Sequence, residues 1–368
     1  MRSFVWRKLI SVPLLVVAIT GACSECGAQA ISLNDKQRAR LIALVSSDPE
    51  AKALCGRVIE DANQDLSAQP HPLKQIQTEG KLQSDPVKVE TQKGLMDTGK
   101  VFSLGIAYTV TGDLKYSEKV KQFILAWAEV NKPTGDPIDE TNLEPLMIGY
   151  DLVRKTFSDS ERDRADRWLK KVAEEEISNK RSGGTAINNW NSHRLKIIGL
   201  AAFLTGDEKL LHHAVDGYME QIRVNLRPDG SSLDFEERDA LHYHCYDLEP
   251  LLTLARVAQL NGIDLYNYTS PKGASLPKSV QFALPYASGE KTHAEFVNST
   301  VAFDRKRAAA GEQRYIAGRP FDPSDARKTV ELDSFFDASM QPLLLKMYGG
   351  RAHKYATFQE VFLDAERQ

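Results

Sequence analysis

Cysteine is scarce in this sequence, and an excess of positive charge is lacking. Two of the four cysteines, Cys23 and Cys26, fall within the first thirty residues, which leaves Cys55 and Cys245 in the rest of the chain. These two can pair only if the fold brings them together, which their spacing does not reveal. The first thirty residues carry three basic groups and one acid, so without them the formal net charge goes from −3 to −5. Such a mildly acidic protein is a poor general binder of nucleic acids.

Residues 31–368 also lack long apolar runs and the common metal and nucleotide motifs. No later apolar segment approaches the length needed to span a membrane. No HExxH, CxxC or P-loop pattern occurs in this part of the chain. We therefore expect no metal, no cofactor and no membrane association beyond a cleaved leader, and we expect a monomer.

The N-terminus is typical of an exported protein. Arg2, Arg7 and Lys8 precede the apolar run of residues 9–22, and residues 28–30 (AQA) supply small side chains at the cleavage positions. The sequence therefore predicts a signal peptide over residues 1–30 and a periplasmic or secreted product. We find no break in composition within residues 31–368, which predicts one domain there.

Nearly every long segment has helical periodicity, and strand-like alternation is scarce before residue 270. Two passages resemble each other, LGIAYTVTGDLKYSEKVKQFILAW from Leu104 and IGLAAFLTGDEKLLHHAVDGYMEQI from Ile198, with a looser copy, TLARVAQLNGIDLY, from Thr253. In each, Gly can end one helix and Asp can cap the next. Repeated helical hairpins predict an all-α fold, an (α/α) toroid or incomplete barrel of antiparallel pairs.

Further helices are expected over residues 143–157, 159–178 and 334–347. Pro342 predicts a kink or break in the third of these helices.

The first dense polar motif is AINNWNSHRLKIIG, residues 186–199, which leads into a core helix. One asparagine suffices to cap a helix, so the surplus of polar side chains indicates a binding site. Asn189 and His193 are four residues apart and share one helical face. The motif contributes the following candidate substrate-binding or catalytic residues: Asn188, Asn189, Trp190, His193 and Arg194. Asn142 lies at another helix entrance, where a cap is the default interpretation and substrate contact the alternative.

The second motif is RDALHYHCYDLEPL, residues 238–251. Asp239, Tyr243 and Tyr246 fall on one helical face if the helix has begun by Asp239. His242 and His244 point in different directions on a helix, which disfavours a metal pair there.

These residue types suit the β-elimination of a polyuronate. That reaction needs a neutralised carboxylate, a base for the adjacent C5 proton and an acid for the leaving glycosidic oxygen. Amide and Arg donors serve the first need, and Tyr or His serves the others. Hydrolysis would instead require two opposed carboxylates, for which Glu236, Glu237 and Asp139 are candidates.

The two motifs resemble those of the alginate lyases of the helical-toroid type and their uronate-lyase relatives. The likeness extends to TGDLKYSEKVKQFILAWA (residues 111–128) and FALPYASGEKTHAEFVNSTVAFDR (residues 282–305), and thus covers most of residues 31–368. It implies that Tyr246 is the acid, and can also be the base, and that Asn189 neutralises the carboxylate.

The chain departs from that family in two places. Trp190 stands where the mannuronan lyases have His after the second Asn, and the nearest imidazole is that of His193. Asp239 stands where they have Arg, with Arg238 one residue earlier. Helical geometry makes His193 a candidate base or carboxylate partner. Tyr243 and His244 are possible substitutes in the same motif.

The resemblance implies a lyase that acts on an anionic polysaccharide, with mannuronate-rich alginate as the first choice and glucuronan as the rival substrate. A glycoside hydrolase and a non-catalytic polymer-binding protein are the alternatives. The sequence leaves open endo or exo action.

Overall fold

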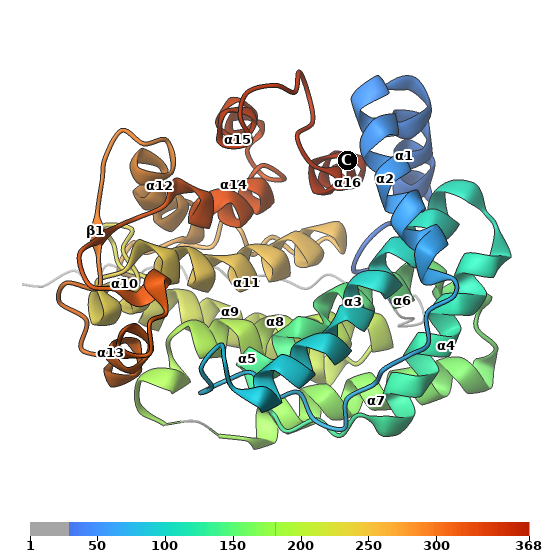
Figure 1. Cartoon of the computed structure of the whole chain (residues 1–368), viewed down its shortest axis with the longest axis horizontal. Helices are drawn as coiled ribbons and strands as arrows, with labels where there is room; N and C mark the ends of the chain where they lie inside the picture. The colour runs from blue at the N-terminus through green and yellow to red at the C-terminus, as the bar shows by residue number, and fades with distance from the viewer. Residues whose placement is uncertain (1–28, 181, 368) are drawn as a thin grey trace, which may run out of the picture.

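Regular structure in the computed structural model, which describes residues 29–180 and 182–367, is almost entirely helical (Figure 1). The longer helices are α1 (Asp35–Ser47), α2 (Pro49–Asp65), α3 (Pro86–Thr111), α4 (Leu114–Val130), α6 (Glu144–Val153), α7 (Asp159–Ser178), α8 (Asn189–Thr205), α9 (Glu208–Asn225), α11 (Leu241–Leu260) and α12 (Leu276–Ala287). The shorter helices are α5 (Pro137–Glu140), α10 (Leu233–Arg238), α13 (Ala302–Ala309), α14 (Arg327–Asp333), α15 (Gln341–Met347) and α16 (Phe358–Glu366).

Two of the predicted helical hairpins are confirmed, and their turns work as the sequence indicates. Gly112 ends α3 with a φ of 72°, and Asp113 accepts a hydrogen bond from the first turn of α4. Gly206 ends α8 with a φ of 65°, and Asp207 caps α9 in the same way. A left-handed residue after a helix favours glycine because a Cβ atom would clash there.

The third expected hairpin is only half right. Gly262 does follow the end of α11 with a φ of 82°. The next helix, α12, begins only at Leu276. The intervening segment is made of turns and an isolated bridge between Thr269 and Ser275.

The helical hairpins are arranged as a toroid. Helix α3 packs on α6, α8 packs on α6 and α11, and α11 packs on α14, so these helices form successive neighbours around the molecule. Helices α4, α7 and α9 pack outside them. The C-terminal α16 returns to contact α1 and α2, beside which it lies in Figure 1. The predicted fold class is therefore confirmed.

Helices α8 and α11 form the centre of the core. The apolar side chains of α8, among them Leu195, Ile198 and Phe203, are buried on all sides of the helix. A helix that is buried all round needs neighbours on every side, and α6, α7, α9 and α11 supply them. The polar N-terminal turns of α8 and α11 are therefore held in place by a rigid interior.

The other helix predictions fare unevenly. Residues 159–178 are confirmed as α7, and α6 occupies the middle of the range 143–157. The prediction of a helix from residue 334 is wrong, because α14 ends just before it and α15 begins only at Gln341. Pro342 lies in the first turn of α15, where a missing N–H costs nothing, so it starts this helix instead of breaking it.

The strands of the described residues amount to a short antiparallel pair, β1 (Ala294–Glu295) and β2 (Arg319–Pro320). Cys55 in α2 and Cys245 in α11 are both buried and free, so they do not pair. Within residues 29–180 and 182–367, none of the helices has the length and apolar character of a membrane span.

The predicted leader lies outside the described residues except for its last two positions. The backbone N–H of Gln29 donates to the Phe203 carbonyl, and the Ala30 carbonyl accepts from Asn261.

Candidate active site

The entrance of α8 is held by a buried carboxylate. Asn188 caps the helix and accepts a hydrogen bond from the Trp190 N–H. The backbone N–H of Asn189 donates to Asp234 Oδ2 at 2.7 Å, and its side-chain amide donates to the other oxygen of Asp234. The Asn189 Nδ2 carries two N–H groups, and Asp234 accepts one of them. Burial raises the pKa of Asp234 to about 6.

One turn further along α8, His193 faces Tyr246 of α11. The two ring centroids are 4.4 Å apart with an interplanar angle of 42°. The Nδ1 atom of His193 is hydrogen-bonded to Thr141 Oγ1 at 2.8 Å. Its Nε2 atom is buried and makes no hydrogen bond of normal geometry among the described residues, although the Tyr246 backbone lies near enough to the imidazole to oppose the lowering of its pKa. His193 of the first motif and Tyr246 of the second therefore lie against each other.

The second motif does not begin as the helical spacing predicted. Asp239 ends α10 with a φ of 49°, and α11 starts only at Leu241, so Asp239 does not share a helical face with the tyrosines. Its carboxylate accepts hydrogen bonds from Asn298 at 2.9 and 3.0 Å. Tyr243 and Tyr246 do lie on one side of α11, with ring centroids 6.3 Å apart.

Two arginines surround Tyr243. The guanidinium of Arg238 lies over the Tyr243 ring, 3.8 Å from its centroid, and donates to Asp304. The Nη1 atom of Arg307, in α13, donates to the Tyr243 hydroxyl at 2.8 Å. Arg238 thus contacts Tyr243, although it stands one residue before the position at which the resemblance implies an arginine.

Burial governs the protonation of the central pair. It lowers the pKa of His193 well below that of a free imidazole, and the positive charge of Lys196 lowers it further. It also raises the pKa of Tyr246, and the negative charge of Glu249 adds to this shift. At neutral pH the site therefore holds a neutral imidazole beside a protonated phenol. This combination can accept one proton and donate another.

Three predicted site residues are directed elsewhere. The Arg194 side chain is buried, with its Nε atom 3.4 Å from Glu176 of α7. His244 is buried, with Nδ1 bonded to Ser232 Oγ and Nε2 to the Ser279 carbonyl, each at 2.9 Å. Burial lowers its pKa to about 4.

The third of these residues, Asn142, donates to the carbonyls of Ile138 and Asp139 in its own turn. The structure thus places Arg194, His244 and Asn142 in the framework around the site.

Sequence reasoning missed the partners of the central residues. They are Thr141, which holds His193, and Asp234, which holds Asn189. Thr141 adjoins the predicted Asn142, and Asp234 precedes the second motif by four residues. Their residue types carried no signal, because a Thr or Asp near a helix entrance is most often a cap.

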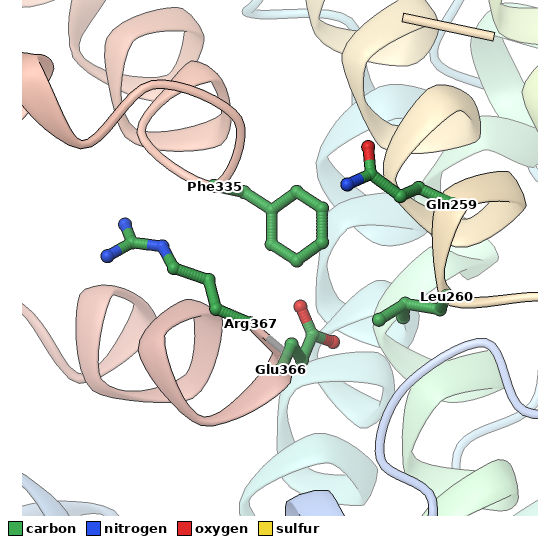
Figure 2. Close-up of a pocket in the computed structure, with 5 residues that line it drawn as sticks. All are labelled: Gln259, Leu260, Phe335, Glu366 and Arg367. Atoms are coloured by element: carbon green, nitrogen blue, oxygen red, sulfur yellow. The ribbon is translucent and has the colours of Figure 1, made fainter. Parts of the chain in front are cut away.

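Two cavities among the described residues lie away from both motifs. One of about 300 Å³ lies at the end of α11, and Figure 2 shows its five lining residues: Gln259, Leu260, Phe335, Glu366 and Arg367. Another of about 450 Å³ lies at the start of the described chain and includes Asn34, Arg38 and Asp151. Neither lining contains a residue of the two motifs.

The fold resembles that of solved alginate lyases. It matches an alginate lyase from Bacteroides ovatus with a TM-score of 0.68 and 17% identity, over 91% of this chain and 98% of that chain. It matches alginate lyase A1-III from Sphingomonas species A1 with a TM-score of 0.60 and 18% identity, over 84% and 88% of the two chains. A variant of A1-III has been solved in complex with a tetrasaccharide.

Sequence comparison points the same way. A polysaccharide lyase of Stenotrophomonas maltophilia is 28% identical over an alignment of 174 positions that covers 43% of this chain. The chain spans about half the length, 51%, of that curated relative. The family model for alginate lyases matches residues 47–293, which contain both motifs and most of the toroid. The chain belongs to the alginate lyase family.

Proposed function

We propose that this protein is an exported polysaccharide lyase that cleaves a 1,4-linked polyuronate, mannuronate-rich alginate first, by β-elimination. The pairing of His193 with Tyr246 carries the proposal, because the imidazole has a buried Nε2 atom that makes no hydrogen bond of normal geometry among the described residues and lies against a phenol. The family and the tetrasaccharide bound by A1-III support a polyuronate as the substrate.

The proposed reaction distributes the protons as follows. The second amide N–H of Asn189 neutralises the substrate carboxylate, with Arg238 nearby as the positive charge. His193 Nε2 takes the C5 proton, the electron pair forms the C4=C5 double bond, and the C4–O bond breaks. The Tyr246 hydroxyl then protonates the departing glycosidic oxygen. The raised pKa of Tyr246 keeps the phenol protonated and the lowered pKa of His193 keeps the imidazole neutral, which are the protonation states that an acid and a base need before the reaction.

Two of the three carboxylates that are candidates for the hydrolase alternative, those of Glu236 and Asp139, are engaged in local structure. Glu236 accepts from the Arg227 guanidinium at 2.7 to 3.0 Å. Asp139 Oδ1 accepts from both N–H and hydroxyl groups of Thr78 and from the Glu79 N–H. Their commitment to these local contacts favours elimination over hydrolysis, which needs two carboxylates free to act on the sugar.

A panel of polymers tests the proposal. Residues 31–368 are incubated with polymannuronate, polyguluronate, glucuronan and hyaluronan, and ultraviolet absorbance reports the unsaturated uronates that elimination forms. We expect absorbance to grow fastest with polymannuronate. Faster growth with glucuronan would identify glucuronan as the preferred substrate and would leave the proposed elimination reaction unchanged. Saturated reducing ends without absorbance would show a hydrolase, and binding without turnover would show a carrier.

A further inference from the structure

The segment that follows the predicted leader is anchored by one carboxylate. Asp151, in α6, accepts three hydrogen bonds at its Oδ2 atom. Two come from the backbone N–H groups of Ile31 and Ser32, at 3.1 and 2.9 Å, and the third comes from the Ser32 hydroxyl. Both Ile31 and Ser32 are fully buried. The first two residues after the predicted cleavage point are therefore held against the toroid by their own backbone.

The charge of Asp151 is compensated mainly by neutral groups. Its three donors carry no charge, and Arg38 donates to the Asp151 backbone carbonyl, at 3.3 Å. None of the ion pairs among the described residues involves the Asp151 carboxylate. Burial raises the pKa of Asp151, although Ser32 and Arg38 oppose the shift. A carboxylate in such surroundings is stabilised further by a positive charge in direct contact with it.

The other charged groups around Asp151 have partners of their own. Asp151 lines the cavity of about 450 Å³ at the start of the described chain, together with several cations. Three of these cations form ion pairs with acids other than Asp151: Arg154 with Asp166, Lys155 with Asp35 and Arg162 with Asp159. A new cation at the Ile31 nitrogen would therefore meet Asp151 without displacing an existing ion pair.

We propose that cleavage between Ala30 and Ile31 gives the processed chain an N-terminal ammonium that binds Asp151 and fixes the start of the chain to the toroid. Hydrolysis of this peptide bond by a leader peptidase adds one water across the C–N bond, so that Ala30 keeps a carboxylate and Ile31 gains an ammonium. The small side chains of Ala28 and Ala30 suit the positions before such a cut. The inference rests on the export included in the proposed function and is independent of the proposed reaction.

Cleavage changes the kind of contact at the Ile31 nitrogen. An amide donates one uncharged N–H, whereas an ammonium has three N–H groups, and its charge strengthens each bond that it makes to a carboxylate. One of them can stay on Asp151, and the adjoining cavity gives water access to the others. Cleavage also removes the contacts of Gln29 with Phe203 and of Ala30 with Asn261. The processed chain thus exchanges two neutral hydrogen bonds for one ion pair.

The burial of Ile31 also sets the order of cleavage and folding. Because Ile31 is fully buried, a peptidase cannot reach the bond that precedes it once the toroid has formed. Cleavage must therefore come before folding. A chain that folds without being cut keeps an uncharged nitrogen against Asp151 and lacks the ion pair of the processed chain.

The first residue of the exported protein tests the cleavage point. The full chain is expressed with its leader in a bacterial host and recovered from the periplasm, and its intact mass identifies the first residue. We expect Ile31. A chain that begins at Gln29 or at any other residue, or that stays uncut, would overturn the proposal, because no ammonium would then face Asp151.

A thermodynamic cycle tests the ion pair. Residues 31–368 and residues 29–368 are released from a removable fusion, so that the Ile31 nitrogen is an ammonium in the shorter chain and an amide in the longer one. Asp151→Asn is made in both chains, and calorimetry measures Tm at neutral pH. We expect this substitution to lower Tm by about 3 °C or more beyond its effect in the longer chain. An equal loss in the two chains would overturn the ion pair.

Asp35→Asn is the matched control for this cycle. Asp35 lines the same cavity, but its side chain is 78% exposed and pairs with Lys155. It should therefore shift Tm equally in both chains. None of these measurements requires turnover, so an inactive protein would contradict the proposed reaction and leave the ion pair standing.

A measurement without substitution decides the question if Asp151→Asn protein does not fold. The Ile31 amine of residues 31–368 is acetylated by an amine-directed reagent, and mass spectrometry follows the modification of the N-terminal peptide. We expect the folded chain to react at least about tenfold more slowly than the urea-unfolded chain, because an ion pair keeps the amine protonated. Equal rates would show that the ammonium is free and would overturn the proposal.

Discussion

The imidazole of His193 lies against the phenol ring of Tyr246, with their centroids 4.4 Å apart. The two residues come from the second turns of α8 and α11, helices that pack against each other. Thr141 fixes the imidazole from the other side through its Nδ1 atom. The burial that holds this pair in place also keeps the imidazole neutral and the phenol protonated. The burial of the pair therefore determines both its position and its protonation state.

Removing the Tyr246 hydroxyl should stop the reaction and leave the fold intact. We expect Tyr246→Phe to lower the rate of unsaturated uronate formation by at least about 100-fold, because no other group donates a proton to the leaving oxygen. Tyr218→Phe is the control, since Tyr218 is fully buried in α9 and its hydroxyl has no hydrogen-bond partner among the described residues. It should retain full activity. A Tyr246→Phe protein as active as the control would remove Tyr246 from the mechanism.

Thr141 should act as a positioning residue for His193. In Thr141→Val the imidazole loses the hydrogen bond that selects its tautomer and orientation, so kcat should fall by roughly 10- to 100-fold. Thr141→Ser keeps the hydroxyl and should restore most of kcat. KM should change little in either variant, because Thr141 does not bind the substrate in this scheme. Steady-state kinetics on the preferred polymer gives both constants, and equal kcat values in Val and Ser variants would contradict the role.

The pH profile of kcat/KM should lack an acidic limb at the ordinary imidazole pKa of 6.5. Because the pKa of His193 is lowered in the folded protein, the residue stays neutral and able to accept a proton well below that pH. The same shift means that the folded state excludes a proton that the unfolded state binds. The free energy of unfolding should therefore decrease as the pH falls below 6.5, because the unfolded state then binds a proton at His193 and the folded state does not. An acidic limb centred at the ordinary value would show that another group is the base.

Asp234 should be energetically coupled to Asn189. Replacing Asn189 by Ala leaves a buried carboxylate without one of its donors, which should reduce the free energy of unfolding by about 1–3 kcal/mol. The double variant Asn189→Ala and Asp234→Ala should lose less than the sum of the two single changes. Denaturant unfolding of the wild type and the three variants measures the coupling. Strict additivity would mean that Asp234 does not hold Asn189.

Glu176 should make the protein less stable as the pH rises. Burial, and next repulsion by Glu140, raises its pKa above the ordinary 4.5, although Arg194 opposes the shift. The folded state therefore holds a proton that the unfolded state releases, and the free energy of unfolding decreases above the ordinary glutamate pKa. Glu176→Gln should flatten this slope between about pH 5 and about pH 9 and be more stable than the wild type at the alkaline end.

The exposed neighbour Glu174 provides the control for this measurement, and Glu174→Gln should keep the slope of the wild type. Denaturant unfolding at several pH values compares the three proteins. A wild-type slope retained in Glu176→Gln would assign the pH dependence to other groups.

Much of the fold could be predicted from local signals. The Thr-Gly-Asp turns after α3 and α8 were correctly interpreted, because a left-handed glycine and a capping aspartate act within a few residues. The start of α15 was missed, since Pro342 is compatible with either the first turn of a helix or a break in one. Whether the helix has begun by Asp239 is left open by the spacing, and in the structure Asp239 has a left-handed conformation and is hydrogen-bonded by Asn298, far along the chain.

By itself the sequence determined the helical class, the repeated hairpins and the two polar motifs, because helical periodicity, caps and residue chemistry are local properties. Only the tertiary structure decided which polar side chains meet. Asn142 was the candidate at its helix entrance, but the neighbouring Thr141 is the residue that forms the hydrogen bond to His193. His244, another candidate, is instead buried and hydrogen-bonded to Ser232 and Ser279. The hydrogen bond from the Gln83 N–H to the Glu312 carboxylate joins two residues that are 229 positions apart in the chain. Such contacts arise from how whole helices pack, and spacing along the chain carries no record of them.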